Sequence, residues 1–218
     1  MTLIAPSVLA ADFSRLGDEI ADTVKAGADQ LHLDIMDGHF VPNISYGPSV
    51  VKTVNSLTDL PLDVHLMLTN PEDFFEAFIK AGADAITFHI EVHPNPVSHL
   101  DKLHEMGVEA GLSLNPDKAV DLVLPYLEKC DRLLVMSVFP GFGGQKFIES
   151  TLTTIEKART FIDRHGLKTV IAVDGGVDGT NATRVVVAGA DILVMGSAFY
   201  RHDNRAGLVR EVHALGRP

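Results

Sequence analysis

The chain has 218 residues, of which 46% are hydrophobic and 22% are charged, so its composition is that of a globular protein and excludes a disordered chain. Its 18 Lys and Arg residues against 29 Asp and Glu residues leave a formal net charge of −11, which excludes sequence-independent binding to nucleic acid or to an anionic membrane. Cys130 is the single cysteine, so the chain can form neither an intrachain disulfide nor a multi-cysteine metal site.

The N-terminal segment MTLIAPSVLAADF differs from a signal peptide. It has no basic residue near its start, and Pro6 and Asp12 interrupt its apolar stretch. No run in the sequence approaches the ~18 consecutive apolar residues that a membrane span requires. The sequence therefore predicts a cytoplasmic protein with no membrane partner.

Short apolar runs of β type alternate with longer segments of helical period along the chain. The predicted strands are Leu3–Leu9, Gln30–Met36, Leu62–Leu68, Ala85–Ile90, Glu109–Leu114, Arg132–Val138, Thr169–Asp174 and Asp191–Met195. Eight strands, each followed by a helix, predict a single (β/α)₈ barrel, the TIM barrel fold, over residues 1–218. A doubly wound open sheet is the alternative, but no GxGxxG follows the first strand.

Two of the intervening segments have clear helical signals. In Ser14–Ala26, the residues Leu16, Ile20 and Val24 are predicted to share one buried face. In Glu72–Ala81, Pro71 suits the first helical position and Asn70 is predicted to cap the helix.

The tetrapeptide AGAD occurs three times, each time between a predicted helix and the following strand. A glycine at this position is typical of a left-handed helix cap, which predicts three similar helix-to-strand turns. The same composition could reflect only what such turns prefer, so it is no evidence of a gene duplication. The three copies are Ala26–Asp29, Ala81–Asp84 and Ala188–Asp191.

Polar residues interrupt strands that would otherwise be apolar throughout, as buried parallel strands normally are. His32 and Asp34 are two residues apart and therefore share a strand face, while His65 and Asp174 lie on other strands. The carboxyl ends of barrel strands converge on one mouth, where active sites form. Two imidazoles and two carboxylates can hold one divalent ion of zinc, iron, manganese or cobalt. The alternative is a set of buried, hydrogen-bonded polar residues.

Two methionines, Met36 and Met67, lie on the strands of His32 and His65, and a third, Met136, lies on the predicted strand Arg132–Val138. Methionine usually fills gaps in a core. A second interpretation is an apolar wall that shields the reacting carbon of a substrate.

Glycine-rich turns follow the three last strands. Glycine lets backbone N–H groups approach an anion closely, and barrels often bind phosphate with the loops after strands seven and eight. The sequence therefore predicts a phosphate site built from these turns, whose residues are Gly141, Gly143, Gly144, Gly175, Gly176, Gly196 and Ser197.

Several segments together resemble the ribulose-phosphate 3-epimerase family, in the order in which that family carries them. The longest is LHLDIMDGHFVPN from Leu31 to Asn43, and the others are APS, DVHLM, PGFGGQKF and VDGG. Phe139 and Ala172 differ from the polar residue and the Glu that are usual in the family. The resemblance implies a TIM barrel that interconverts D-ribulose 5-phosphate and D-xylulose 5-phosphate in the pentose phosphate pathway.

Residue roles follow from the same resemblance. It implies that His32, Asp34, His65 and Asp174 bind the metal and that Asp34 and Asp174 are the two acid/base residues. Ser7 and His65 are also expected to contact the substrate. Inversion at C3 requires proton removal on one face and proton delivery on the other, through an enediolate that the metal stabilises. The family also implies a homo-oligomer, either a dimer or a hexamer.

Three other functions remain open from the sequence. The first is an epimerase for a related ketose phosphate such as D-allulose 6-phosphate. The second is a decarboxylase on a similar barrel, although its Asp-x-Lys-x-x-Asp pattern is missing, since Asp34-Ile35-Met36-Asp37 contains no lysine. The third is a sugar-phosphate or metal sensor without catalytic activity.

Overall fold

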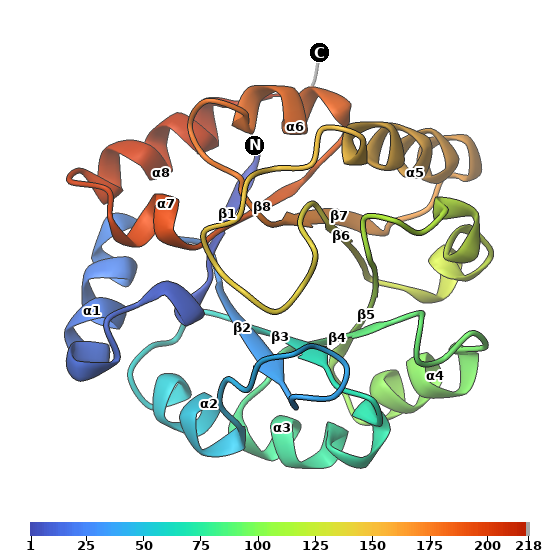
Figure 1. The fold of residues 1–218 in the computed structure, drawn as a ribbon, viewed down its shortest axis with the longest axis horizontal. Helices are drawn as coiled ribbons and strands as arrows, with labels where there is room; N and C mark the ends of the chain where they lie inside the picture. The colour runs from blue at the N-terminus through green and yellow to red at the C-terminus, as the bar shows by residue number, and fades with distance from the viewer. Residues whose placement is uncertain (217–218) are drawn as a thin grey trace.

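The computed structural model describes residues 1–216. Eight parallel strands lie in one sheet, in the order β1-β8-β7-β6-β5-β4-β3-β2, and form a ring that helices surround (Figure 1). A parallel bridge between Ser7 and His32 joins the two ends of the sheet and closes the barrel. The strands are β1 (Leu3–Pro6), β2 (Leu31–Met36), β3 (Leu62–Met67), β4 (Ala85–His89), β5 (Glu109–Leu114), β6 (Arg132–Met136), β7 (Val170–Asp174) and β8 (Ile192–Met195).

The predicted (β/α)₈ barrel is therefore confirmed, and the open doubly wound sheet is excluded. Every predicted strand is present, with ends at most three residues from the prediction. The largest difference is at β1, which ends at Pro6 because Val8–Ala10 turns into a 3₁₀ helix.

The expectation of a helix after every strand is wrong at one position. Between β5 and β6 the chain forms two 3₁₀ helices, Val120–Leu122 and Leu124–Lys129, in place of an α-helix. Pro125 lies in the second of them, and a proline removes a backbone donor that an α-helix would need. The α-helices are α1 (Leu16–Ala26), α2 (Pro48–Asn55), α3 (Phe75–Ala81), α4 (Val97–Glu105), α5 (Thr151–His165), α6 (Ala182–Ala188), α7 (Ser197–Tyr200) and α8 (Arg205–Ala214).

The predicted buried face of the first helix is wrong in one residue. Ile20 is fully buried, but Val24 is 42% exposed and Thr23 is buried instead. At 100° per residue, Thr23 lies closer than Val24 to the line through Leu16 and Ile20, so the barrel covers Thr23.

The predicted cap at Asn70 is also wrong. The Asn70 side chain donates to the carboxylate of Asp73 and accepts no backbone N–H of the helix. A 3₁₀ helix, Pro71–Asp73, precedes α3 here. The predicted left-handed caps are present at Gly27 and Gly82, whereas Gly189 has a positive φ but lies outside the left-handed helical region.

The inside of the barrel has one apolar side and one polar side. Because Leu31, Leu33 and Ile35 pack outward against the helices, the alternate residues of β2 point inward. The apolar side comes from β1, β6, β7 and β8, and consists of Ala5, Leu134, Met136, Ala172, Ile192 and Val194. The polar side comes mainly from β2 to β5, and its buried residues include His32, Asp34, Asp63, His65, Thr87, His89, Ser113 and Arg132.

Within residues 1–216, no helix combines the length and the apolar character that a membrane crossing would need.

Candidate active site

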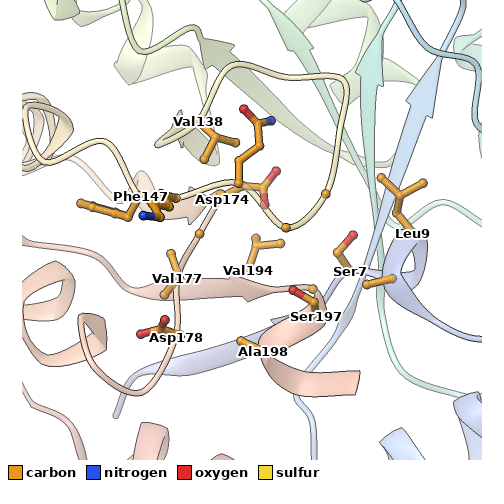
Figure 2. A pocket seen from close by; sticks show the side chains of 18 of the residues that line it. Ser7, Leu9, Val138, Phe147, Asp174, Val177, Asp178, Val194, Ser197 and Ala198 are labelled. Carbon is orange, nitrogen blue, oxygen red and sulfur yellow. The ribbon is translucent and has the colours of Figure 1, made fainter. Parts of the chain in front are cut away.

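A cavity of about 870 Å³ opens at the carboxyl ends of the strands. Ser7, Asp174, Val194 and Ser197 border it from β1, β7 and β8 or directly after them (Figure 2). The cavity thus lies at the mouth where the sequence predicted the site.

The structure brings the four predicted ligands together. His32, Asp34, His65 and Asp174 each offer a ligand atom, and these atoms lie within 4.8 Å of one another. His32 Nε2 is 3.2 Å and His65 Nδ1 is 3.0 Å from the same Asp34 oxygen, Oδ1. Two imidazoles and two carboxylates at these separations fit one divalent ion of borderline character.

The two carboxyl groups of this cluster have pKa values shifted in opposite directions. Burial and the negative charge of Asp34 raise the pKa of Asp174 to about 7. Burial opposes ionisation of Asp34 as well, but the His32 charge and hydrogen bonds from both histidines lower its pKa below the ordinary value. Such a pair, one carboxyl ionised and one able to hold a proton, is the arrangement that acid–base chemistry requires.

Two serines hold Asp34 in place. The Ser7 hydroxyl donates to Asp34 Oδ2 at 2.6 Å, and the Ser45 hydroxyl donates to the Asp34 backbone carbonyl at 2.6 Å. Ser7 thus contacts a predicted catalytic carboxylate and also borders the cavity. Its contact with substrate stays a prediction.

Three buried residues next to the cluster were missed from the sequence. Asp63 accepts a hydrogen bond from His32 Nδ1 at 2.8 Å, and Arg132 Nη1 is 2.6 Å from the same Asp63 oxygen. The Nε2 atom of His89 lies 2.9 Å from the Nε2 atom of His65. The spacing of Asp63 and His65, two residues apart on β3, would have placed Asp63 on the inner face.

The three predicted methionines also border the cavity, but on two sides of it. Met36 and Met67 pack together with Val41, whereas Met136 belongs to the apolar side of the barrel interior. Together they give the cavity an apolar lining near the two carboxyl groups.

All seven predicted phosphate-site residues border the cavity. The loops after β6 and β7 pack so closely that side chains would not fit between them. A Cβ on Gly176, whose φ is +64°, would be 2.5 Å from the backbone nitrogen of Phe147. A Cβ on Gly175 would be 2.4 Å from the side chain of Val138. The glycines therefore let two backbone segments meet beside the cavity.

The loop between β6 and α5 lies over the centre of the ring (Figure 1). Asn43 donates to the Gly141 carbonyl at 2.6 Å, and Gln145 donates to the carbonyls of Phe139 and Phe142. Both phenylalanines are about half exposed. Phe139 therefore adds apolar surface to the outside of this loop.

A second group of possible ligands, Glu72, His93 and His99, lies after β3 and β4. Its two imidazole rings stack face to face, with centroids 4.1 Å apart. Since the nitrogen lone pairs lie in the ring planes, they run side by side and do not converge on one point. This group differs in that respect from the cluster at the mouth.

The raised pKa of Asp174 predicts how pH affects stability. In the folded state Asp174 keeps its proton up to about pH 7, whereas in the unfolded chain it loses the proton near its ordinary pKa of 3.8. The stability of the metal-free protein therefore falls as the pH rises between these two values. Asp174→Asn removes this loss. We expect the metal-free variant to be more stable than wild type by about 2 kcal/mol at about pH 8, after allowance for partial exposure, and nearly equal at about pH 4. Urea unfolding at both pH values measures the difference, and equal stability at the higher pH would contradict it.

The family and the fold both have known relatives. The model of the ribulose-phosphate 3 epimerase family matches residues 3–200. Ribulose-phosphate 3-epimerase of Bacillus subtilis is 47% identical over 213 residues, which cover 97% of this chain and 98% of that protein. That of Synechocystis sp. is 46% identical over 218 residues, which cover 99% of this chain and 95% of that protein.

Solved structures add evidence for the fold. The 3-hexulose-6-phosphate synthase from Salmonella typhimurium superposes with a TM-score of 0.69 at 18% identity, covering 99% of this chain and 98% of that one. At that identity the likeness supports the barrel and nothing finer. The family resemblance and the expectation of an epimerase are confirmed by the relatives: the chain is an enzyme that belongs to the ribulose-phosphate 3-epimerase family.

Proposed function

We propose that the enzyme inverts C3 of a pentulose 5-phosphate and so interconverts D-ribulose 5-phosphate and D-xylulose 5-phosphate. The observation that carries this proposal is the pair Asp34 and Asp174, which meet in one cavity with pKa values shifted in opposite directions. Family membership supports a phosphosugar substrate.

The two carboxyl groups divide the proton transfer between them. They belong to β2 and β7, which are not neighbours in the sheet, so a substrate carbon between them has one group on each face. One carboxylate removes the C3 proton, and the other carboxyl group delivers a proton to the opposite face of the resulting enediolate. In the reverse reaction the two groups exchange roles.

The donor set of His32, Asp34, His65 and Asp174 would hold one divalent ion, of zinc, iron, manganese or cobalt. Such an ion supplies a Lewis acid that stabilises negative charge developing on the substrate oxygens. Asp63 orients the His32 ring by accepting a hydrogen bond from the Nδ1–H of His32, and the Ser7 hydroxyl donates a hydrogen bond to one Asp34 oxygen.

The glycine loops and the methionines would bind and shield the substrate. Backbone N–H groups in the loops after β6, β7 and β8 would hold the phosphate, with Ser197 at the start of α7 beside them. Met36, Met67 and Met136 would exclude water from the reacting carbon. We further propose that residues 1–218 work as one catalytic domain, in the cytoplasm, within a homo-oligomer whose size sedimentation would measure.

Removing the metal tests the donor set. We expect a chelator to reduce kcat by at least about 10²-fold, because Lewis-acid stabilisation of the enediolate is lost, and added Co²⁺ or Zn²⁺ to restore it. Metal analysis should find about one ion per chain, and His32→Ala should lower that content. Full activity in metal-free protein would contradict the proposed metal site.

Isotope incorporation tests the reaction itself. In deuterium oxide, the product formed from D-ribulose 5-phosphate should carry deuterium at C3, since a carboxyl group in exchange with solvent delivers the second proton. Mass spectrometry and NMR of the product measure it. Product without deuterium would exclude this route. A higher kcat/KM for D-allulose 6-phosphate in the same assay would instead make that ketose the preferred substrate.

A further inference from the structure

We propose that His89 and Glu91 are positioning residues that determine which ring nitrogen of His65 carries its proton, and thereby set the affinity of the site for its metal. The inference rests on the metal site proposed above.

Three hydrogen-bonding contacts run in series from the cluster toward the rim of the barrel. His65 Nε2 is 2.9 Å from His89 Nε2, and His89 Nδ1 is 3.2 Å from Glu91 Oε2. The other Glu91 oxygen, Oε1, accepts the backbone N–H of Asn115 at 2.7 Å. The series therefore starts at a predicted metal ligand and ends at a fixed backbone donor.

The series is enclosed by protein. His65 and His89 are fully buried, and their rings stack with centroids 5.0 Å apart. The ring of Phe40 also packs against the ring of His89, with centroids 4.6 Å apart. The Glu91 side chain is 14% exposed. Each ring nitrogen must thus satisfy its hydrogen bond with the neighbours named here, because bulk water has little access.

Only one arrangement of protons suits a metal ligand at His65. Its Nδ1 faces Asp34 and the cluster, so Nδ1 must keep a free lone pair and the ring proton must sit on Nε2. That Nε2–H donates to His89 Nε2, which is then an acceptor. The proton of His89 must therefore sit on Nδ1, where a Glu91 carboxylate accepts it.

The charge state of Glu91 agrees with this arrangement. Burial opposes its ionisation, but the hydrogen bonds from His89 and from the Asn115 backbone N–H lower its pKa, so the Glu91 carboxylate is an acceptor.

Glu91→Gln should move the ring protons of both His89 and His65 to their other nitrogens. The amide oxygen must face the N–H of Asn115, which turns the NH₂ group toward His89 Nδ1. That NH₂ donates, so the His89 proton moves to Nε2 and the His65 proton moves to Nδ1, the ligand atom. Glu91→Ala only removes the acceptor and dictates neither arrangement.

The experiment measures Co²⁺ binding to metal-stripped protein by competition with a chelator. We expect Glu91→Gln to weaken Co²⁺ binding about 10–100-fold, which is the typical effect on metal affinity of losing a hydrogen-bond partner behind a metal ligand. Glu91→Ala should weaken Co²⁺ binding less. Glu72→Gln is the matched control: Glu72 accepts a hydrogen bond from His93 at 2.7 Å on the same rim, in a pair that no contact joins to His65 within the described residues. It should bind Co²⁺ within about twofold of wild type.

The outcomes separate this inference from the proposed function. Wild type that binds no Co²⁺ overturns both. If wild type binds Co²⁺ and Glu91→Gln binds it equally tightly, the inference is overturned but the metal site stands. The same holds if Glu91→Ala binds Co²⁺ more weakly than Glu91→Gln does. Ring-nitrogen NMR of zinc-loaded wild type gives a second test that needs no variant. It should find the His89 proton on Nδ1, and a proton on Nε2 would overturn the inference.

Discussion

Asp34→Asn and Asp174→Asn should each lower kcat by about a thousandfold or more, because each removes one of the two groups that we propose to transfer a proton at C3. An amide can neither accept the C3 proton nor deliver one. The two substitutions keep the shape of the side chain, so the barrel should fold in both. Epimerisation measured from each epimer gives kcat, and circular dichroism checks the fold.

Loss of the metal alone could also stop turnover, so the experiment needs a finer measurement. A single carboxyl group can still exchange the C3 proton of the epimer whose C3–H points toward it. In deuterium oxide and excess Co²⁺, each variant should therefore exchange C3 of one epimer only, and the two variants should differ in which epimer they label. Such opposite labelling cannot arise from metal loss, which would affect both epimers.

Glu149→Gln is the matched control for these variants. Glu149 borders the same cavity, but its carboxylate is exposed and pairs with Arg184 at the surface. Its removal should change kcat by no more than about twofold. If either aspartate variant kept turnover near that of this control, the scheme with two acid/base groups would be wrong.

The stability of Asp174→Asn should move in the opposite direction to its activity. Asp174 sits where burial and Asp34 disfavour its charge, so the protein gains stability when that charge is removed. Active sites commonly hold ionisable groups whose charge the fold disfavours, because the shifted pKa serves the chemistry at a cost in stability.

The sequence predicted the inner face of β2 well, because the two-residue period of a strand places His32 and Asp34 together without any knowledge of the rest of the fold. It also placed Asp174 at the mouth, since the carboxyl ends of barrel strands converge there and Asp174 ends its strand. Which side chains then meet depended on barrel closure. Ser7 reaches Asp34 only because β1 and β2 join there.

The residues that were missed have a common reason. Asp63 and His89 lie at opposite ends of largely apolar strands, and such a residue looks the same in a sequence whether its partner is a backbone group or a histidine of the site. Their partners lie 31 and 24 residues away, on neighbouring strands. The 3₁₀ segments after β5 were missed because the regular alternation of strands and helices was extended over Pro125.

A buried ion pair that contacts His32 carries the largest expected effect on stability. Arg132, the first residue of β6, and Asp63 have side chains only 5% and 1% exposed, and Arg132 also reaches Glu109 at 3.1 Å. Burial opposes ionisation of Asp63, but the charge of Arg132 and contact with His32 lower its pKa to about 2. The Asp63 carboxylate is therefore charged at neutral pH and depends on Arg132.

Arg132→Met should lower the free energy of unfolding by about 3–5 kcal/mol, because it leaves a buried carboxylate without its partner. For a chain of this length, that corresponds to a fall in Tm of roughly 10 °C. Urea and thermal unfolding measure both. Arg184→Met is the control: its guanidinium also binds a carboxylate, that of Glu149, but at the surface, so the change should stay below about 1 kcal/mol.

The double variant Asp63→Asn with Arg132→Met separates the charge from the rest of the site. Removing both charges should recover most of the lost stability, since replacing a buried ion pair by neutral groups is often close to neutral. It should bind Co²⁺ more weakly than wild type, because an amide in place of Asp63 is a weaker acceptor for His32 Nδ1–H than a carboxylate. A double variant as unstable as Arg132→Met would show that shape, and not charge, makes Arg132 necessary. A double variant that bound Co²⁺ as tightly as wild type would show that His32 needs no carboxylate behind it.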